Sequence, residues 1–267
     1  MASVKEQAVE IAQRFVAARR AAGCLADYPG SLPERLEDAY AIQDAAIREW
    51  DRPILGWKVG RIAAPLSDRY GSDRLAGPIF QTVESTEGET AHMPIFAHGF
   101  AAAEAEFLLR IGKAPPSGKR SFTLGEAADL IDAVHVGVEI ASSPLKPINE
   151  IGPAAIISDF GNNNGLLIGS EISNWRDSGF ECWEVATTIN GREAGRGEAS
   201  AFANGAIGSA KFLFELMAER GIELRPGQWI SSGAVTGVHD VKPGERIEVR
   251  FDRWYEIDCK AVAAEPE

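Results

Sequence analysis

Three glutamates lie in two segments where polar and apolar residues alternate. Glu104 and Glu106 belong to the run Ala-Glu-Ala-Glu-Phe-Leu-Leu, and Glu139 belongs to His-Val-Gly-Val-Glu-Ile. A period of two is typical of a β-strand, in which residues i and i+2 point to the same side. Glu104 and Glu106 are therefore expected to share one face of a strand, and Glu139 is expected on a second alternating strand.

Carboxylates held side by side on a strand repel each other and reduce stability. A divalent cation removes this repulsion, and ligand sets made only of oxygen suit hard ions such as Mg2+ or Mn2+. The alternative is a strand with one solvated face, whose carboxylates simply meet water. The spacing alone favours this alternative, so a metal site needs support from other segments.

Lys58 lies in the motif Gly-Trp-Lys-Val-Gly at residues 56–60. Alternation places Gly56, Lys58 and Gly60 on one strand face, and the two glycines would let a ligand or another backbone approach closely. An amine beside a metal or in an apolar cleft has a lowered pKa and can transfer protons near neutral pH. A single lysine on a strand is more often exposed to solvent.

Three further segments collect small and polar residues. Residues 158–165 (Ser-Asp-Phe-Gly-Asn-Asn-Asn-Gly) place several amides before an apolar run, and Gly-Arg-Gly at residues 195–197 follows a hairpin signal. Residues 232–237 (Ser-Gly-Ala-Val-Thr-Gly) follow a short strand, where hydroxyls and backbone N–H groups could hold a carboxylate.

Composition excludes several classes of function. The formal net charge of −12 over 267 residues argues against a surface for nucleic acid or anionic membranes. No apolar stretch approaches the roughly 20 residues of a membrane span, and no signal peptide is evident. The three cysteines are widely spaced and fit no metal motif, so free thiols and a cytoplasmic location are expected.

Local patterns predict helices near both ends of the chain and strands between them. An amphipathic helix is expected over residues 4–21 and another through about Trp50, opened by a capping box from Ser31 to Glu34. A second capping box, from Thr123 to Glu126, starts a helix running into residue 133, and the helix over residues 201–220 should end at Gly221. Irregularly separated strands indicate an α+β protein with mainly antiparallel or mixed sheets.

The motifs taken together resemble those of the fumarylacetoacetate hydrolase superfamily, and more narrowly its 2-keto-4-pentenoate hydratase / 4-oxalocrotonate decarboxylase branch. Their order and spacing agree over about residues 5–255. The segments that carry the resemblance are residues 56–60, 104–106, 138–140, 158–165, 195–197 and 232–237.

The resemblance implies a β-rich core, a distorted roll or sandwich, with a mostly helical N-terminal region. We place that region at residues 1–70 and the catalytic domain at residues 71–267. The resemblance further implies Mg2+ or Mn2+ bound by Glu104, Glu106 and Glu139, and a proton-transferring Lys58. It also implies a substrate-binding set, which comprises Asp159, Asn162, Ser232, Gly233 and Thr236.

By the same resemblance, the expected activity is a metal-dependent hydro-lyase of aromatic catabolism. It would add water to a 2-hydroxy-2,4-dienoate or 2-oxo-4-enoate through a metal-stabilised enolate. The expected partners are this small acid and further copies of the chain in a homo-oligomer, with a partner decarboxylase or hydratase as an additional candidate. The alternatives are a 4-oxalocrotonate-type decarboxylase, a C–C hydrolase of acylpyruvate or fumarylacetoacetate type, and a non-catalytic partner subunit.

One position departs from the family pattern. In typical hydratases of this branch, the lysine strand continues into a Thr-Ser pair and then a short motif with an active-site aspartate. Here the strand continues as Arg-Ile-Ala at residues 61–63, and ungapped counting places the aspartate position at Ala76. Asp73 could replace it only with a shift in register. No histidine lies between residues 55 and 91, which argues against the histidine-dependent C–C hydrolases of the superfamily.

Overall fold

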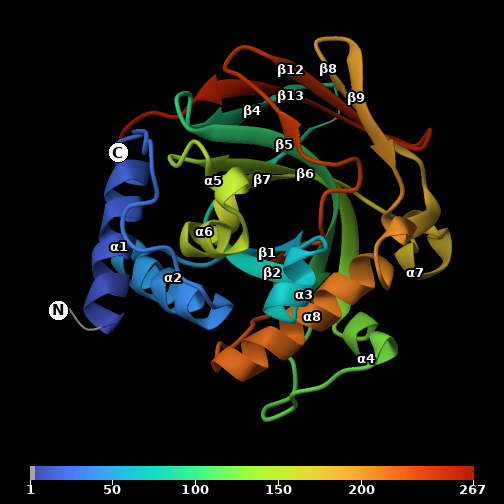
Figure 1. Ribbon diagram of the computed structural model, residues 1–267. Coiled ribbons are helices and arrows are strands. Elements are labelled where there is room, and N and C mark those ends of the chain that lie inside the picture. The colour runs from blue at the N-terminus through green and yellow to red at the C-terminus, as the bar shows by residue number, and fades with distance from the viewer. Residues whose placement is uncertain (1–3, 87) are drawn as a thin grey trace.

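The large β-sheet at the centre of the molecule carries the strands of Lys58 and of the three glutamates, whereas the segment at residues 195–197 lies in the second sheet (Figure 1). The computed structural model describes residues 4–86 and 88–267. Both parallel and antiparallel neighbours occur in this sheet. Its strands, in spatial order, are β2 (Arg74–Ile79), β1 (Gly56–Arg61), β10 (Trp229–Ser231), β5 (Phe100–Ile111), β6 (Ile131–Ser143), β7 (Asn163–Glu171) and β3 (Thr82–Glu84), and β11 (His239–Asp240) pairs with β5.

A second, five-stranded sheet packs against the large one. Phe107 of the large sheet lies between the two, with its ring centroid 5.4 Å from that of Phe251 and 4.9 Å from that of Phe180. The main hydrophobic core therefore fills the space between the sheets. The strands of the second sheet, in spatial order, are β4 (Thr90–Ile95), β13 (Tyr255–Ala263), β12 (Arg246–Phe251), β8 (Val185–Ile189) and β9 (Arg192–Gly197). The expected α+β fold with a β-rich core is confirmed.

The first two helices, α1 (Val4–Arg20) and α2 (Leu36–Trp50), lie side by side, and α2 packs against α6 (Pro153–Ser158) (Figure 1). Helix α2 does not begin with the predicted capping box, because its N-cap is Arg35, whose side chain makes no capping hydrogen bond. Within the N-terminal region, α2 ends at Trp50 and only the short helix α3 (Leu66–Tyr70) follows. Strand β1, which also lies within residues 1–70, is instead paired between β2 and β10. The division into two domains stays a prediction.

The remaining helices are short, apart from one. The Thr123–Glu126 capping box is confirmed, but its helix is brief because residue 131 already begins β6. The long helix begins at Gly205 and ends, as predicted, at Gly221, which has a φ of 67°. The α-helices are α3 (Leu66–Tyr70), α4 (Leu124–Ala128), α5 (Ile148–Ile151), α6 (Pro153–Ser158), α7 (Trp175–Ser178) and α8 (Gly205–Arg220), and the 3-10 helices are η1 (Phe160–Asn162), η2 (Phe180–Cys182) and η3 (Ala199–Ala201). None of the helices formed by the described residues combines the length and the apolar character needed to cross a membrane.

The contact between β2 and η1 depends on Gly77. A Cβ at this position would lie 2.2 Å from the carbonyl oxygen of Phe160, so backbone meets backbone with no room for a side chain. Gly77→Ala is therefore expected to destabilise the protein by about 1–3 kcal/mol, the usual effect of overpacking. Urea denaturation measures this difference.

The matched control for this prediction is Gly125→Ala in α4, where an added Cβ meets nothing within 4 Å. This variant should be neutral or slightly more stable, since alanine is the better helix former. Equal stability of the two variants would contradict the close approach of η1 to β2.

Candidate metal centre

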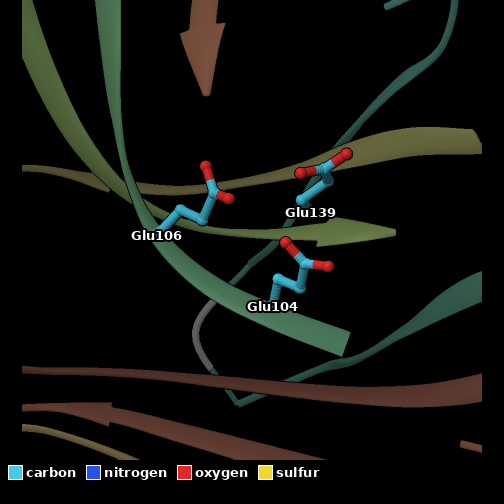
Figure 2. Close-up of side chains that lie close together, drawn as sticks. All are labelled: Glu104, Glu106 and Glu139. Carbon is cyan, nitrogen blue, oxygen red and sulfur yellow. The ribbon is translucent and has the colours of Figure 1, made fainter. Parts of the chain in front are cut away.

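The three glutamates converge on one face of the large sheet (Figure 2). Antiparallel pairing of β5 with β6 places Glu104 directly opposite Glu139, and Glu106 is two residues farther along β5 on the same face. One carboxylate oxygen from each residue lies within 4.8 Å of the other two. Glu104 is 5% exposed and the others are fully buried, which excludes the solvated-face alternative. The predicted shared face is thus confirmed.

Burial and mutual repulsion disfavour ionisation in this cluster. Desolvation raises the pKa of Glu104 to about 7, an effect that Lys58 reduces and Glu139 increases. Desolvation also raises the pKa of Glu106 well above its usual value, and Glu139 and Glu104 add to this. Buried carboxylates are stable only with compensating positive charge or hydrogen bonds. Three such groups around one lysine therefore leave uncompensated negative charge.

Glu106 provides the most direct test of whether a cation fits. Its Oε2 accepts hydrogen bonds from the Ser231 hydroxyl and from the Gly233 backbone N–H, the latter at 3.0 Å. Its Oε1 is buried and has no hydrogen-bond partner among the described residues. A buried acceptor left unpaired is costly, and a donor set made only of carboxylate oxygens matches a hard divalent cation. The residues present therefore fit Mg2+ or Mn2+.

Lys58 lies on β1 with its ammonium group beside the glutamates. It is 4% exposed, and its Nζ lies 3.3 Å from Glu139 Oε2. Desolvation by itself would lower the pKa of Lys58, but Glu139, Glu104 and Glu106 together raise it to about 12. The lowered pKa predicted from the sequence is therefore not found while the carboxylate charge is uncompensated.

Amide side chains fix the orientation of this polar cluster. Lys58 Nζ donates to Asn162 Oδ1 at 3.2 Å, and Asn162 Nδ2 donates to Asn149 Oδ1 at 3.2 Å. Asn163 Nδ2 donates to Glu139 Oε1 at 3.0 Å. Because an ammonium group can only donate, the orientation of Asn162 follows from Lys58. Asn149 is not among the predicted site residues, because no local sequence pattern marks it.

Asp159, a predicted substrate-binding residue, lies in a buried hydrogen-bond network, and its contact with substrate stays a prediction. It is fully buried, and its Oδ1 and Oδ2 accept from Arg19 Nε at 2.5 Å and Nη2 at 3.0 Å. The Ser143 hydroxyl donates to the same Oδ2 at 2.5 Å. Both oxygens are thus engaged, and Asp159 is absent from the cavity wall described next. Arg19, also missed, follows the buried Phe15 by four residues and so lies on the buried stripe of α1.

A cavity of about 680 Å3 opens beside the glutamates. Of the predicted site residues, it is lined by Lys58, Glu104, Asn162, Ser232 and Gly233. Thr236 is not part of this wall; its hydroxyl lies 2.8 Å from that of Thr187 and 3.0 Å from His239 Nε2. Its contact with substrate stays a prediction.

The structure gives no substitute for the missing aspartate beside Lys58. Ala76 pairs with Val59 and faces the core, whereas Gly77 pairs with Lys58. The residue of β2 next to Lys58 is therefore a glycine, which has no side chain and cannot replace the aspartate. Asp73 precedes β2 and lines the cavity, where it forms an ion pair with Arg74 at 3.0 Å.

Curated relatives agree with the branch inferred from the motifs. No family model matches the chain. The chain is 24% identical over 263 residues to the 4-oxalocrotonate decarboxylase of Pseudomonas putida, covering 97% of this chain and 98% of that one. It is also 24% identical over 252 residues to the 2-keto-4-pentenoate hydratase of Paraburkholderia xenovorans, covering 92% of each.

Solved structures agree with the fold. The 4-oxalocrotonate decarboxylase of Pseudomonas putida G7, complexed with magnesium and adipate, superposes with a TM-score of 0.82 at 20% identity, covering 98% of this chain and 99% of that one. The fumarylpyruvate hydrolase of Pseudomonas aeruginosa, in complex with Mn2+ and pyruvate, gives a TM-score of 0.56 at 18% identity, covering 78% and 88%. The chain is therefore similar over nearly its whole length to a 4-oxalocrotonate decarboxylase and to a 2-keto-4-pentenoate hydratase, and it shares the fold of these solved structures.

Proposed function

We propose that the protein is a divalent-metal-dependent lyase that adds water to a 2-hydroxy-2,4-dienoate or a 2-oxo-4-enoate. The observation that carries this proposal is the buried cluster of Glu104, Glu106 and Glu139 beside Lys58, at the wall of a cavity. The curated hydratase relative supports the hydro-lyase assignment. A homo-oligomeric state, association with a partner decarboxylase or hydratase, and a cytoplasmic location remain predictions.

Each residue of the site has a separate proposed role, which follows from the chemistry of its side chain. Glu104, Glu106 and Glu139 would hold the cation, which when bound supplies a Lewis acid that stabilises negative charge on the 2-oxo oxygen. Lys58 holds a proton at Nζ, which it can deliver to the far end of a dienol. The Ser232 side chain lies in the cavity wall and is available for the carboxylate of the substrate. The Gly233 N–H is not available, because it donates to Glu106.

Decarboxylation is the second candidate, and one observation favours it. Strand β2 carries no carboxylate beside Lys58, so an acid or base for handling water is missing there. Loss of CO2 needs the same stabilisation of negative charge but no delivery of water. Product analysis on a 2-oxo-4-enoate and on a 4-oxalocrotonate-type acid separates the two: hydration yields a 4-hydroxy-2-oxo acid, and decarboxylation releases CO2. If neither product forms at any metal concentration, both assignments are contradicted.

Metal binding has its own test, which needs no substrate. Adding Mg2+ or Mn2+ at about a hundredfold excess over Kd should raise the Tm by roughly 5 °C, because an ion that binds only the folded state stabilises it. Glu106→Gln should abolish this increase in Tm, since the substitution replaces one carboxylate oxygen with an amide nitrogen, which cannot bind the ion. Without metal, the variant should be at least as stable as the parent, because its amide cannot carry the negative charge that burial, Glu139 and Glu104 disfavour at this position. Differential scanning fluorimetry measures both effects.

The control for the metal test is Glu171→Gln. This residue lies on β7 with a side chain that is 58% exposed, outside the cluster. Its variant should keep the full metal-dependent increase in Tm. An equal loss in both variants would indicate nonspecific binding and would contradict the proposed centre.

A further inference from the structure

A chain of two hydrogen bonds leads from the buried Lys58 to the wall of the cavity. Lys58 Nζ donates to Asn162 Oδ1, and Asn162 Nδ2 donates to Asn149 Oδ1, each at 3.2 Å. Lys58 and Asn162 are buried, whereas Asn149 is exposed and lines the cavity together with both of them. The chain therefore connects the ammonium group beside the glutamates to a side chain that a ligand can reach.

The direction of both hydrogen bonds is determined at the buried end. An ammonium group has no acceptor, so Asn162 must turn its carbonyl oxygen toward Lys58 and its NH2 group toward Asn149. Asn149 must in turn present its carbonyl oxygen to Asn162. Its own NH2 group forms no hydrogen bond with any residue in the part of the chain that the structure describes. The cavity wall thus carries an amide donor whose orientation is set by Lys58.

The neighbours of this donor on the cavity wall are apolar. Asn149 is the second residue of α5. The other cavity-lining residues within 148–158, a range that the structure describes in full, are Gly152, Pro153 and Ile156. None of these three has a polar side chain, so the Asn149 amide is the one side-chain donor on this part of the wall. A donor placed in this way discriminates in favour of ligands with an oxygen acceptor at the matching position.

We propose that Asn149 binds the 4-hydroxyl group of a 4-hydroxy-2-oxo acid, and so discriminates this acid from one that lacks the hydroxyl. The inference rests on the proposed function, in which the metal centre holds the 2-oxo end of the acid and Lys58 meets the far end of the dienol. Carbon 4 adjoins the carbon that Lys58 reaches, and only Asn162 separates Lys58 from Asn149 along the hydrogen-bond chain. The contact is a hydrogen bond from Asn149 Nδ2 to the hydroxyl oxygen.

The test compares 4-hydroxy-2-oxopentanoate with 2-oxopentanoate, which differ by the hydroxyl alone. Calorimetric titration of the protein in excess Mg2+ should give about fivefold tighter binding of the hydroxy acid, the usual contribution of one neutral hydrogen bond. Asn149→Ala should remove this preference and leave the affinity for 2-oxopentanoate nearly unchanged. Ser67→Ala is the control, because Ser67 lines the same cavity from α3 and its loss should keep the preference. Both variants should retain the metal-dependent increase in Tm, which shows that they are folded.

Two outcomes would overturn the proposal: equal affinity of the parent protein for the two acids, or a preference that Asn149→Ala retains. Turnover tests the proposed function separately. If a 2-oxo-4-enoate is hydrated but the preference does not depend on Asn149, the hydro-lyase assignment stands and the role of Asn149 is wrong. If the preference depends on Asn149 but no 2-oxo-4-enoate is hydrated, the binding residue stands and the hydro-lyase assignment fails.

Discussion

Replacing Lys58 with alanine should lower kcat by on the order of 10³-fold, the usual contribution of a well-placed general acid or base. Lys58 is buried, and its Nζ lies 3.3 Å from Glu139 and 3.2 Å from Asn162, so no bulk water can replace it without rearrangement. Metal binding should persist or tighten, because the substitution removes a positive charge beside the three carboxylates. Steady-state kinetics and the metal-dependent increase in Tm measure the two effects separately.

Lys58→Arg distinguishes proton transfer from simple charge. Arginine retains the positive charge but does not lose its proton at neutral pH. If Lys58 transfers a proton, the arginine variant should be nearly as inactive as the alanine variant while keeping its fold. Full activity in either variant would remove Lys58 from the mechanism, and activity in the arginine variant alone would make it an electrostatic group.

The largest effect on stability is expected from Arg19→Met. Arg19 is 6% exposed and donates to the fully buried Asp159 through Nε and Nη2, and to the carbonyl groups of Asn163 and Ser142. Removing one partner of a buried ion pair leaves the other charge uncompensated, which costs about 3–5 kcal/mol. Urea denaturation, followed by two independent probes, measures the free energy of unfolding.

Two companion variants make the Arg19 result interpretable. The double variant Arg19→Met, Asp159→Asn should recover part of the loss, because the uncompensated charge is gone. Arg14→Ala removes the exposed pair with Glu10, whose side chains are 56% and 61% exposed, and should cost no more than about 0.5 kcal/mol. If Arg19→Met were as mild as Arg14→Ala, the buried pair would not hold α1 against η1 and β7.

Local sequence patterns predicted the features that are determined by residues close together in the chain, namely strand faces and one helix cap. Alternation placed Glu104 and Glu106 on one strand face because side-chain direction in a strand depends only on position. The Thr123–Glu126 capping box was correct for the same reason, since both of its hydrogen bonds form within four residues. The similar box at Ser31 was wrong, because α2 begins five residues later. A local signature alone does not determine where packing allows a helix to start.

Long-range partners could not be predicted. No local pattern indicated that Asp159 pairs with Arg19, which lies 140 residues earlier in the chain. The register that sets Glu104 opposite Glu139 is likewise fixed by the packing of two sheets and not by either strand. The family resemblance predicted that the three glutamates and Lys58 form one site, whereas the spacing of these residues alone did not decide this. It could not indicate that the Gly233 N–H donates to Glu106.

That bond, together with the one from Ser231, joins two parts of the active site. One oxygen of Glu106 accepts from Ser231 and Gly233, while its other oxygen has no hydrogen-bond partner among the residues that the structure describes. Binding of a cation to this carboxylate would therefore change the hydrogen bonds that hold residues 231–233, which border the cavity at Ser232. Thermodynamic linkage makes such an influence reciprocal: an acid that binds this segment would raise the affinity for the ion by the same factor by which the ion raises the affinity for the acid.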